Sequence, residues 1–151
     1  MQVGIISDTH GLMRPEALTA LAASDLIIHA GDIGKLEVLR ALEQLAPTFA
    51  VRGNVDQGPW STLLPEQLDV AVGSLRFRVL HRISDLKIDP AAKRIAAVVY
   101  GHSHKPAIEW RGDLLLLNPG SAGPRRFKLP ITVARVRAAG STIKPELVHL
   151  A

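Results

Sequence analysis

The chain has 151 residues, of which 47% are hydrophobic and 21% are charged, and its formal net charge is +4. This length and composition support a buried core and argue against disorder, so we expect residues 1–151 to form a single domain. The absence of cysteine excludes disulfides, thiolate metal sites and a cysteine nucleophile, which leaves His, Asp, Glu and Asn as metal ligands. No apolar run reaches the ~20 residues of a membrane span, and the first residues lack the pattern of a signal peptide, so a cytoplasmic protein is expected.

The first half of the chain alternates short apolar segments with helical patterns. One helix is expected to begin at Pro15, and a second over Lys35–Ala46, where leucines recur at helical spacing. Buried strands are expected over Val3–Ser7, Leu26–Ala30 and Phe49–Arg52. This β-α-β-α-β order predicts parallel strands joined by helical crossovers.

Strands and hairpins dominate the second half of the chain. A short helix is expected over Asp89–Arg94. The expected strands are Val70–Val72, Leu75–Leu80, Ala96–Tyr100, Ile108–Arg111, Leu114–Leu117, Ile131–Arg137 and Ile143–His149. Two sheets packed face to face and flanked by helices would accommodate both halves in one domain.

Charge is spread unevenly along the chain. The first 75 residues hold 4 Lys/Arg and 9 Asp/Glu, whereas the remainder holds 14 and 5. A basic half is compatible with nucleic-acid binding. However, Arg76-Phe77-Arg78 and Arg135-Val136-Arg137 alternate charged and apolar residues, as strands with one solvent face do. Aromatic residues make up only 4% of the chain, which argues against a surface that stacks bases. Nucleic acid is therefore an alternative partner that we do not favour.

Polar residues that can ligate metals follow five of the ten predicted strands. In parallel sheets, functional groups gather beyond the carboxyl ends of the strands, so we expect these side chains to converge. Seven oxygen and nitrogen ligands are too many for one tetrahedral zinc ion but suit two divalent ions that share one carboxylate. The candidate ligands are Asp8, His10, Asp32, Asn54, His81, His102 and His104.

The blocks SDTHG, HAGDI, GNVD, LH and GHSHKP occur in this order, with NPGS behind them. In this arrangement the sequence resembles the calcineurin-like metallophosphoesterases, and most closely their small bacterial and archaeal phosphodiesterase branch. The resemblance implies an α/β fold, a four-layer α/β/β/α sandwich with two facing mixed β-sheets. It also implies that Asp32 bridges two metals, and that each metal has three further ligands: Asp8, His10 and His104 for the first, and Asn54, His81 and His102 for the second.

The implied reaction is the hydrolysis of a small phosphodiester. Two divalent ions share a water and lower its pKa from about 15.7 towards 7, and the metal-bridging hydroxide attacks phosphorus in line with the leaving oxygen. Asp32, Asn54 and His81 act by positioning the metals and the water. We expect Mn²⁺, while Ni²⁺, Fe²⁺ and Zn²⁺ suit the same mixed ligand set. The resemblance also implies a homodimer or homotetramer.

The chain departs from the family pattern at two positions. Many members have a histidine where this chain has Val55, and that histidine is thought to protonate the leaving group. Its loss predicts weak catalysis on esters with poor leaving groups. After His81, relatives often have Gly-His, whereas here Arg82 follows and is either a phosphate contact or a solvated arginine.

Several other polar residues are candidates for supporting roles. Asp56 is expected to orient Asn54 or a histidine, and His29 to be a hydrogen-bonded core residue or a support for the metal ligands. Asn118 lies in a predicted turn that would support the metal site. Arg125, Arg126 and Lys128 would either attract a phosphorylated substrate or keep a loop soluble.

Three other functions stay open at the level of sequence. A phosphomonoesterase or nucleotide pyrophosphohydrolase would use the same ligands, and a nuclease would need a long open groove. A non-catalytic scaffold is the third, because a retromer subunit related to this family works chiefly through protein contacts. Its ligand set is eroded, however, whereas all seven positions are intact here.

Overall fold

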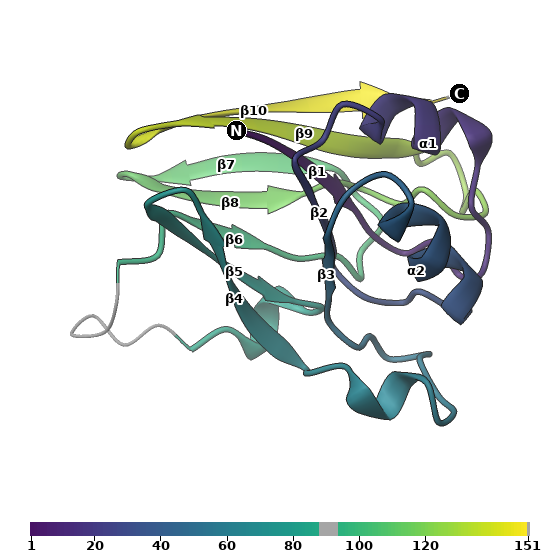
Figure 1. The fold of residues 1–151 in the computed structure, drawn as a ribbon. Coiled ribbons are helices and arrows are strands. Elements are labelled where there is room, and N and C mark those ends of the chain that lie inside the picture. Colours follow the sequence, from purple (N-terminus) through teal and green to yellow (C-terminus); the bar gives the residue numbers. More distant parts are fainter. Residues whose placement is uncertain (88–93, 151) are drawn as a thin grey trace.

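The structure, a computed structural model, describes residues 1–87 and 94–150, and within them two five-stranded sheets pack face to face (Figure 1). The first sheet has the order β10-β9-β1-β2-β3 and comprises β1 (Gln2–Ile6), β2 (Leu26–His29), β3 (Thr48–Ala50), β9 (Thr132–Ala139) and β10 (Thr142–His149). The second has the order β4-β5-β6-β8-β7 and comprises β4 (Gln67–Val72), β5 (Leu75–Leu80), β6 (Ala97–Val99), β7 (Ala107–Arg111) and β8 (Leu114–Asn118). The predicted sandwich of two mixed sheets is thus confirmed.

Four short helices accompany the sheets in the described residues. They are α1 (Pro15–Leu21), α2 (Leu36–Glu43) and the 3₁₀ helices η1 (Ser61–Leu63) and η2 (Ile83–Asp85). The helix predicted over Asp89–Arg94 lies outside the described residues, except for Arg94, which is in no regular element. No helix in the described parts of the chain combines the length and hydrophobicity needed to cross a membrane.

Strands β1, β2 and β3 are parallel, as the β-α-β-α-β order predicted. Strand β1 is central, with β2 on one side and antiparallel β9 on the other. Its Val3 and Ile5 belong to the core between the sheets, whereas Ile6 belongs to the core beneath the helices. Burial of both faces explains why β1 is a continuous apolar run without polar alternation.

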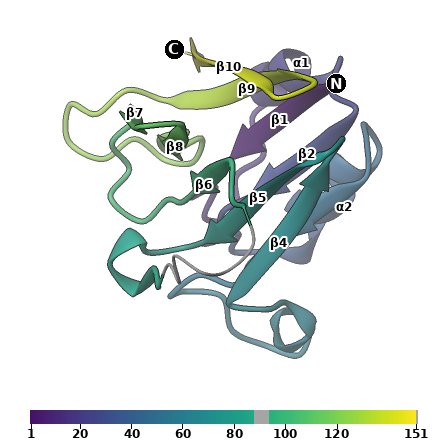
Figure 2. The same cartoon turned by 90° about the vertical axis from the view of Figure 1, so that its left-hand side faces the viewer.

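Helices α1 and α2 cover the outer face of the first sheet (Figure 2). Their buried residues, among them Leu21, Leu39 and Leu42, pack in one cluster with Ile6 and Ile27 of the sheet. Helix α2 ends at Glu43, three residues before the predicted end, where the N–H groups of Leu45 and Ala46 both donate to the carbonyl of Leu42 and tighten the last turn.

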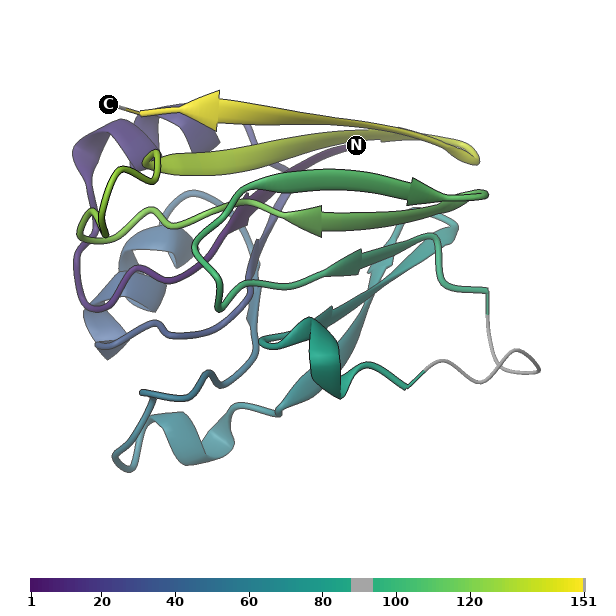
Figure 3. The ribbon, with the colours of Figure 1, turned by 180° about the vertical axis from the view of Figure 1, so that it is seen from behind.

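The outer face of the second sheet carries a smaller cluster. Leu80, Val98 and Leu116 pack there against Ile83 and Leu86, which begin and follow η2. Figure 3, in which this sheet faces the viewer, shows η2 on its outer side. In the described residues, η2 is the helical part of this layer.

Strand β4 begins at Gln67, three residues earlier than predicted. Its first residue pairs with Leu80, so β4 matches the full length of β5. Leu68, Val70 and Val72 pack into the core between the sheets while the residues between them are exposed, which is the alternation of a half-buried strand.

Candidate metal centre

The loops that follow β1 and β2 run side by side beyond the ends of the strands. Asp8 N donates to Gly31 O at 3.0 Å, and His10 N donates to Asp32 O at 2.9 Å. These bonds continue the pairing of the parallel strands for several residues past the sheet. They bring Asp8, His10 and Asp32 together at one edge.

The loops that follow β5 and β6 meet the same edge from the second sheet. Gly101 N donates to His81 O at 2.9 Å, which holds these two loops together. His102 N donates to Asp8 Oδ2 at 3.1 Å and so connects the second sheet to the first. The predicted convergence of the strand ends is therefore present.

The candidate ligands form two adjoining clusters. One contains Asp8, His10 and His104 and the other Asp32, His81 and His102, and within each cluster one ligand atom per residue lies within 4.8 Å of the others. His10 Nε2 lies 3.9 Å from Asp8 Oδ1 and 3.7 Å from Asp32 Oδ2. His81 Nε2 lies 3.9 Å and 3.1 Å from the same two oxygens, so the carboxylates stand between histidines of both clusters.

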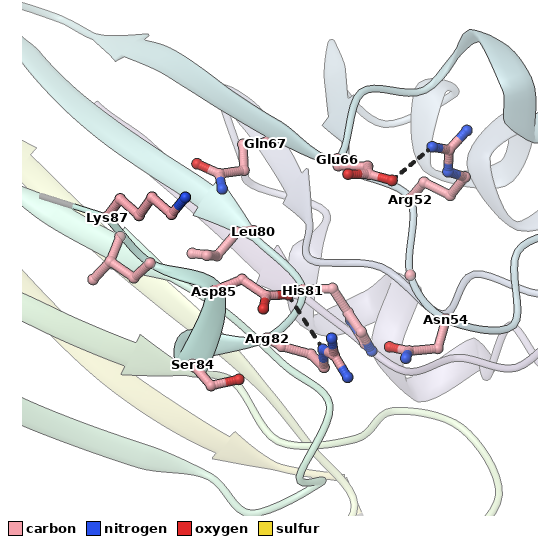
Figure 4. A pocket seen from close by; sticks show the side chains of 12 residues that line it. Arg52, Asn54, Glu66, Gln67, Leu80, His81, Arg82, Ser84, Asp85 and Lys87 are labelled. Carbon is pink, nitrogen blue, oxygen red and sulfur yellow. Dashed lines mark hydrogen bonds and ion pairs between the residues drawn. The ribbon is translucent and has the colours of Figure 1, made fainter.

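Asn54, the seventh candidate, is exposed on the loop that follows β3. It lines a cavity beside the second cluster together with His81, and their side chains lie next to each other (Figure 4). The structure thus brings all seven predicted residues to one edge of the sandwich.

Several atoms in the clusters are buried without a hydrogen-bond partner. They are Asp8 Oδ1, His10 Nε2, His81 Nε2 and His104 Nδ1. His81 Nε2 has Asp32 Oδ2 nearby, but the geometry is not that of a hydrogen bond. An unsatisfied buried polar atom costs about 1–3 kcal/mol, so such atoms call for a ligand. Carboxylate oxygen and imidazole nitrogen suit a divalent transition-metal ion, and the residues therefore fit the metal that the resemblance implies.

The remaining atoms of the same side chains are held in place. Asp8 Oδ2 accepts hydrogen bonds from Ser7 Oγ at 2.8 Å and from His102 N. Asp32 Oδ1 accepts one from Val55 N at 3.0 Å. His81 Nδ1 lies 2.8 Å from Ala30 O, and because a carbonyl only accepts, the nitrogen carries the proton. When the imidazole is neutral, His81 Nε2 therefore has its lone pair free for a cation. Without a metal, burial lowers the pKa of His81, but the contacts with Asp32 and Ala30 O outweigh it and raise that pKa.

Burial and neighbouring charges set the protonation of the site. Burial raises the pKa of Asp8 to about 6, although nearby His81 opposes the shift. Burial acts on Asp32 in the same direction, but contacts from His81 and Val55 N lower the pKa of that carboxyl to about 2. Burial, and then the charge of Arg126, lower the pKa of His104 to about 4. A neutral imidazole is the form in which histidine binds metals.

Five of the candidate ligands adopt the left-handed backbone conformation, which sequence reasoning did not predict. The φ angles are 55° at Asp8, 48° at His10, 56° at Asp32, 74° at His102 and 63° at His104. This conformation costs roughly 1–2 kcal/mol at a residue other than glycine. Such strain persists where the surrounding structure imposes it, and it is concentrated at functional sites.

Two of the glycines beside the candidate ligands are required by close packing. A Cβ atom at Gly53 would overlap Asp32 N and Oδ1. A Cβ at Gly101 would overlap Ser7 Oγ and lie 2.6 Å from Asp8 Oδ2. The loops approach so closely that neither position has room for a side chain.

Asp56 joins two of the loops through backbone groups. Its Oδ2 accepts from Gly53 N at 2.9 Å and from Ile33 N at 3.2 Å, and its Oδ1 accepts from Gly34 N at 2.9 Å. These donors are backbone groups rather than the side chain of Asn54 or a histidine. Asp56 thereby fixes the loop after β2 against the loop after β3.

His29 is fully buried and hydrogen-bonded, as expected for a core residue. Gly31 N donates to His29 Nδ1 at 3.1 Å. Thr9 Oγ1 donates to Ile33 O at 2.9 Å and lies 3.0 Å from His29 Nε2, which fits a neutral imidazole with its proton on Nε2. His29 thus supports the loop that carries Asp8 and His10.

Asn118 supports the loop that carries His102 and His104. Its Nδ2 donates to Gly101 O and Ser103 Oγ, both at 3.2 Å, and its Oδ1 accepts from Gly120 N at 2.9 Å. Ser121 Oγ in the same turn donates to Asp8 O at 3.0 Å. The roles of Ser7 and Ser121 were not predicted, because a serine beside a strand has no distinctive sequence signal.

Arg82 lies next to His81 in the wall of the cavity, where its Nε is 3.3 Å from Asp85 Oδ2 (Figure 4). Arg126, in the loop after β8, acts on the centre through its charge. After burial, which is the largest cause in each case, its positive charge helps to lower the pKa of His104 and of His10. At His102 the charges of His81 and Arg82 act in the same direction ahead of that of Arg126. The structure thus brings two arginines near the clusters.

Residues 1–141 match the family model described as the calcineurin-like phosphoesterase superfamily domain. A "Probable metallophosphoesterase" from Methanothermobacter thermautotrophicus is 34% identical over 99% of this chain and 92% of its own. Another from Methanocaldococcus jannaschii is 38% identical over 80% of this chain and 68% of its own. A "Phosphodiesterase" from the latter organism is 29% identical over 80% of this chain and 83% of its own.

Solved structures share the fold. An archaeal phosphodiesterase superposes with a TM-score of 0.80 at 24% identity and covers 98% of this chain and 100% of its own. Vps29 from Chaetomium thermophilum superposes with a TM-score of 0.78 at 17% identity and covers 99% of this chain and 96% of its own. The family model and the relatives agree with the ligand clusters, and the chain belongs to the calcineurin-like phosphoesterase superfamily, a family of metal-dependent hydrolases.

Proposed function

We propose that this protein is a metal-dependent phosphodiesterase that hydrolyses a small phosphodiester at a dinuclear centre. The observation that carries the proposal is the pair of adjoining clusters with buried, unpaired ligand atoms. The relative named "Phosphodiesterase" supports a diester as the substrate.

Asp8, His10 and His104 would hold one cation, Asn54, His81 and His102 the other, and Asp32 would contribute to both. We propose Mn²⁺ as the cation, because mixed nitrogen and oxygen ligands suit it. When bound, a pair of divalent cations supplies Lewis acidity, which lowers the pKa of a coordinated water and offsets negative charge on a phosphoryl group.

The side chains of the centre contribute charge and orientation. The carboxylates of Asp8 and Asp32 balance part of the cationic charge, and each is fixed through its second oxygen. His81 is oriented by Ala30 O. Val55, which has 48% of its surface exposed beside Asn54, has no proton to donate to a leaving group. The proposed enzyme therefore depends on the acidity of the leaving alcohol.

A phosphomonoesterase or nucleotide pyrophosphohydrolase is the alternative reaction. The relative named "Phosphodiesterase" favours a diester, and the cavity of about 720 Å³ beside the second cluster has room for an ester group of the substrate. A non-catalytic scaffold is the alternative of a different class, and the likeness to Vps29 concerns the fold alone. The intact, oriented donors favour catalysis.

The test compares hydrolysis of bis(p-nitrophenyl) phosphate with that of p-nitrophenyl phosphate, using metal-stripped protein reloaded with Mn²⁺. We expect metal-dependent turnover of the diester, weak turnover of the monoester, and loss of activity in Asn54→Ala and His81→Ala. His149→Ala, in the exposed edge strand β10, is the matched control and keeps full activity. Absence of turnover with every divalent metal, in protein that binds two ions, would contradict the proposal.

The cytoplasmic location, the single domain and the homo-oligomer stay predictions from the sequence.

A further inference from the structure

We infer that the cavity beside the second cluster binds one ester group of the substrate and selects a small polyol without an aromatic base, such as a glyceryl group, over a nucleoside. This inference rests on the proposed phosphodiesterase function. It states which class of alcohol the cavity would bind, which the metal ligands do not determine.

The cavity is continuous with the metal centre. Asn54 and His81 stand at one end, and Gln67 and Lys87 at the other (Figure 4). One wall comes from the end of β5 and from η2, and the other from the loop after β3 and the start of β4. Its volume of about 720 Å³ is in the range of small-molecule sites. A diester bound at the centre would therefore project one substituent into it.

The charges in the cavity are mostly paired. Arg52 Nη2 lies 3.0 Å from Glu66 Oε1, and Arg82 Nε lies 3.3 Å from Asp85 Oδ2. Each arginine that would otherwise bind a second phosphate is thus already compensated by a carboxylate. Lys87 brings the lining to three basic and two acidic residues, which is enough to attract one anionic diester. The pairing argues against a pyrophosphate as the preferred substrate.

The lining is rich in groups that bind hydroxyls. The carboxylates of Glu66 and Asp85 accept hydrogen bonds from hydroxyl groups, while the Gln67 amide and the Ser84 hydroxyl both donate and accept. Apart from His81 at the metal centre, the described lining has no aromatic side chain, and its apolar residues are Leu80 and Leu86. Nucleobases are typically held by stacking on aromatic rings, and the cavity offers no such surface.

The first arm of the test uses two diesters with the same leaving group, glyceryl p-nitrophenyl phosphate and thymidine 5′-(p-nitrophenyl phosphate). p-Nitrophenolate leaves from both. The C2 hydroxyl of the glyceryl diester could also attack phosphorus internally, so its product is identified as glycerol 3-phosphate rather than the cyclic phosphate before the kcat/KM values are compared. We expect the Mn²⁺-loaded protein to prefer the glyceryl diester by about tenfold, as the loss of one or two hydrogen bonds would produce. An equal rate, or a preference for the thymidine diester, would overturn the inference.

The second arm uses variants that leave both ion pairs intact. Gln67→Ala and Ser84→Ala should reduce the preference about threefold or more, mainly through KM for the glyceryl diester. Ser74→Ala is the matched control, because Ser74 lies between β4 and β5 at the far end of their hairpin. A preference that is unchanged in both cavity variants would also overturn the assignment.

Failure of the proposed function has a different signature. It would appear as the absence of metal-dependent turnover of every diester, bis(p-nitrophenyl) phosphate included. Calorimetric titration with glycerol 3-phosphate and thymidine 5′-phosphate tests the cavity independently of diester hydrolysis. We expect tighter binding of glycerol 3-phosphate, weakened by Gln67→Ala and not by Ser74→Ala, and the reverse order of affinities would contradict the inference.

Discussion

Five of the candidate ligands have a strained backbone conformation. Of the six non-glycine residues with positive φ in the described parts of the chain, five belong to the two clusters. Their backbones are held by hydrogen bonds between loops, such as His10 N to Asp32 O and His102 N to Asp8 Oδ2. The strained backbone of these residues, which would perform the chemistry, therefore lowers the stability of the folded chain.

This strain predicts an unusual order of stabilities at His102. In metal-free protein, His102→Gly should be more stable than His102→Ala by about 1 kcal/mol, because glycine adopts positive φ without steric cost. Urea unfolding in the presence of a chelator measures both variants. At His149, in the extended strand β10, the order should reverse. Equal stabilities of the two His102 variants would contradict the assignment of strain.

In the proposed enzyme, we expect Val55 to make the rate depend on the leaving group. We expect Val55→His to raise kcat for diesters with alkyl leaving groups, by up to about 100-fold if the new imidazole acts as a general acid. Bis(p-nitrophenyl) phosphate, whose leaving group needs no proton, should be hydrolysed at nearly the wild-type rate. A plot of log kcat against the pKa of the leaving group measures the effect, and its slope should be less steep for the variant. A parallel slope in both proteins would show that position 55 does not reach the leaving oxygen.

At the scale of elements, His29 connects β2 to the loop after β1. Burial lowers the pKa of His29 from its ordinary 6.5 to about 3, with the charge of His81 in the same direction and that of Asp32 opposed. Between these two pKa values the unfolded chain binds a proton that the folded chain excludes. The free energy of unfolding should therefore fall as the pH drops below about 6.5, by about 1.4 kcal/mol per pH unit from this group.

His29→Gln, which keeps a hydrogen-bonding side chain but cannot titrate, isolates this contribution. Unfolding by urea between pH 4 and 7, again with chelator, measures the slope in both proteins. As the pH falls, the free energy of unfolding of the variant should decrease less steeply than that of the wild type, by about 1.4 kcal/mol per pH unit, which corresponds to one proton. Above pH 7 the two proteins should have the same pH dependence. Identical slopes would mean that His29 is protonated in the folded chain.

The sequence predicted the elements well where burial produced a pattern. The continuous apolar runs of β1 and β2 and the leucine spacing of α2 each correspond to an element with a buried face. Boundaries were wrong where tertiary bonds decided them, as at Gln67, whose place in β4 depends on pairing with Leu80. Pro145 falls inside β10, which is compatible with an edge strand paired on one side only.

The candidate ligands could be predicted because they directly follow strands, where chain order fixes their place in space. The residues that hold them could be predicted less well. Asp56 bonds backbone groups of two loops, and Ser121 bonds the carbonyl of Asp8, contacts that no spacing encodes. The left-handed conformation of His102 and His104 could also not be predicted, because histidine has no strong preference for it.

Across the whole molecule, the candidate metal ligands come from both sheets. Asp8 and Asp32 follow strands of the first sheet, while His81, His102 and His104 follow strands of the second. The basic residues elsewhere are partly paired on the strands, as Arg78 is with Asp69 and Arg135 with Glu146. Cations bound between the sheets should therefore stabilise the folded chain as a unit.

We expect Mn²⁺ to raise the melting temperature of the metal-stripped protein. A ligand at 100 times its Kd stabilises the folded state by about 2.7 kcal/mol, which corresponds to roughly 5–10 °C for a chain of this size. Differential scanning calorimetry with and without chelator measures the shift. His81→Ala should show a smaller shift, whereas His149→Ala should match the wild type. A melting temperature that does not respond to any divalent metal would contradict binding between the sheets.

The most direct test of the dinuclear centre is electron paramagnetic resonance of the Mn²⁺-loaded protein, combined with a count of metal per chain. Two ions that share Asp32 should give two manganese per chain and a spectrum of magnetically coupled Mn²⁺ pairs. His81→Ala should convert it to the six-line spectrum of isolated Mn²⁺. One manganese per wild-type chain, or two with only uncoupled six-line signals, would contradict a shared centre formed by Asp8, His10, Asp32, Asn54, His81, His102 and His104.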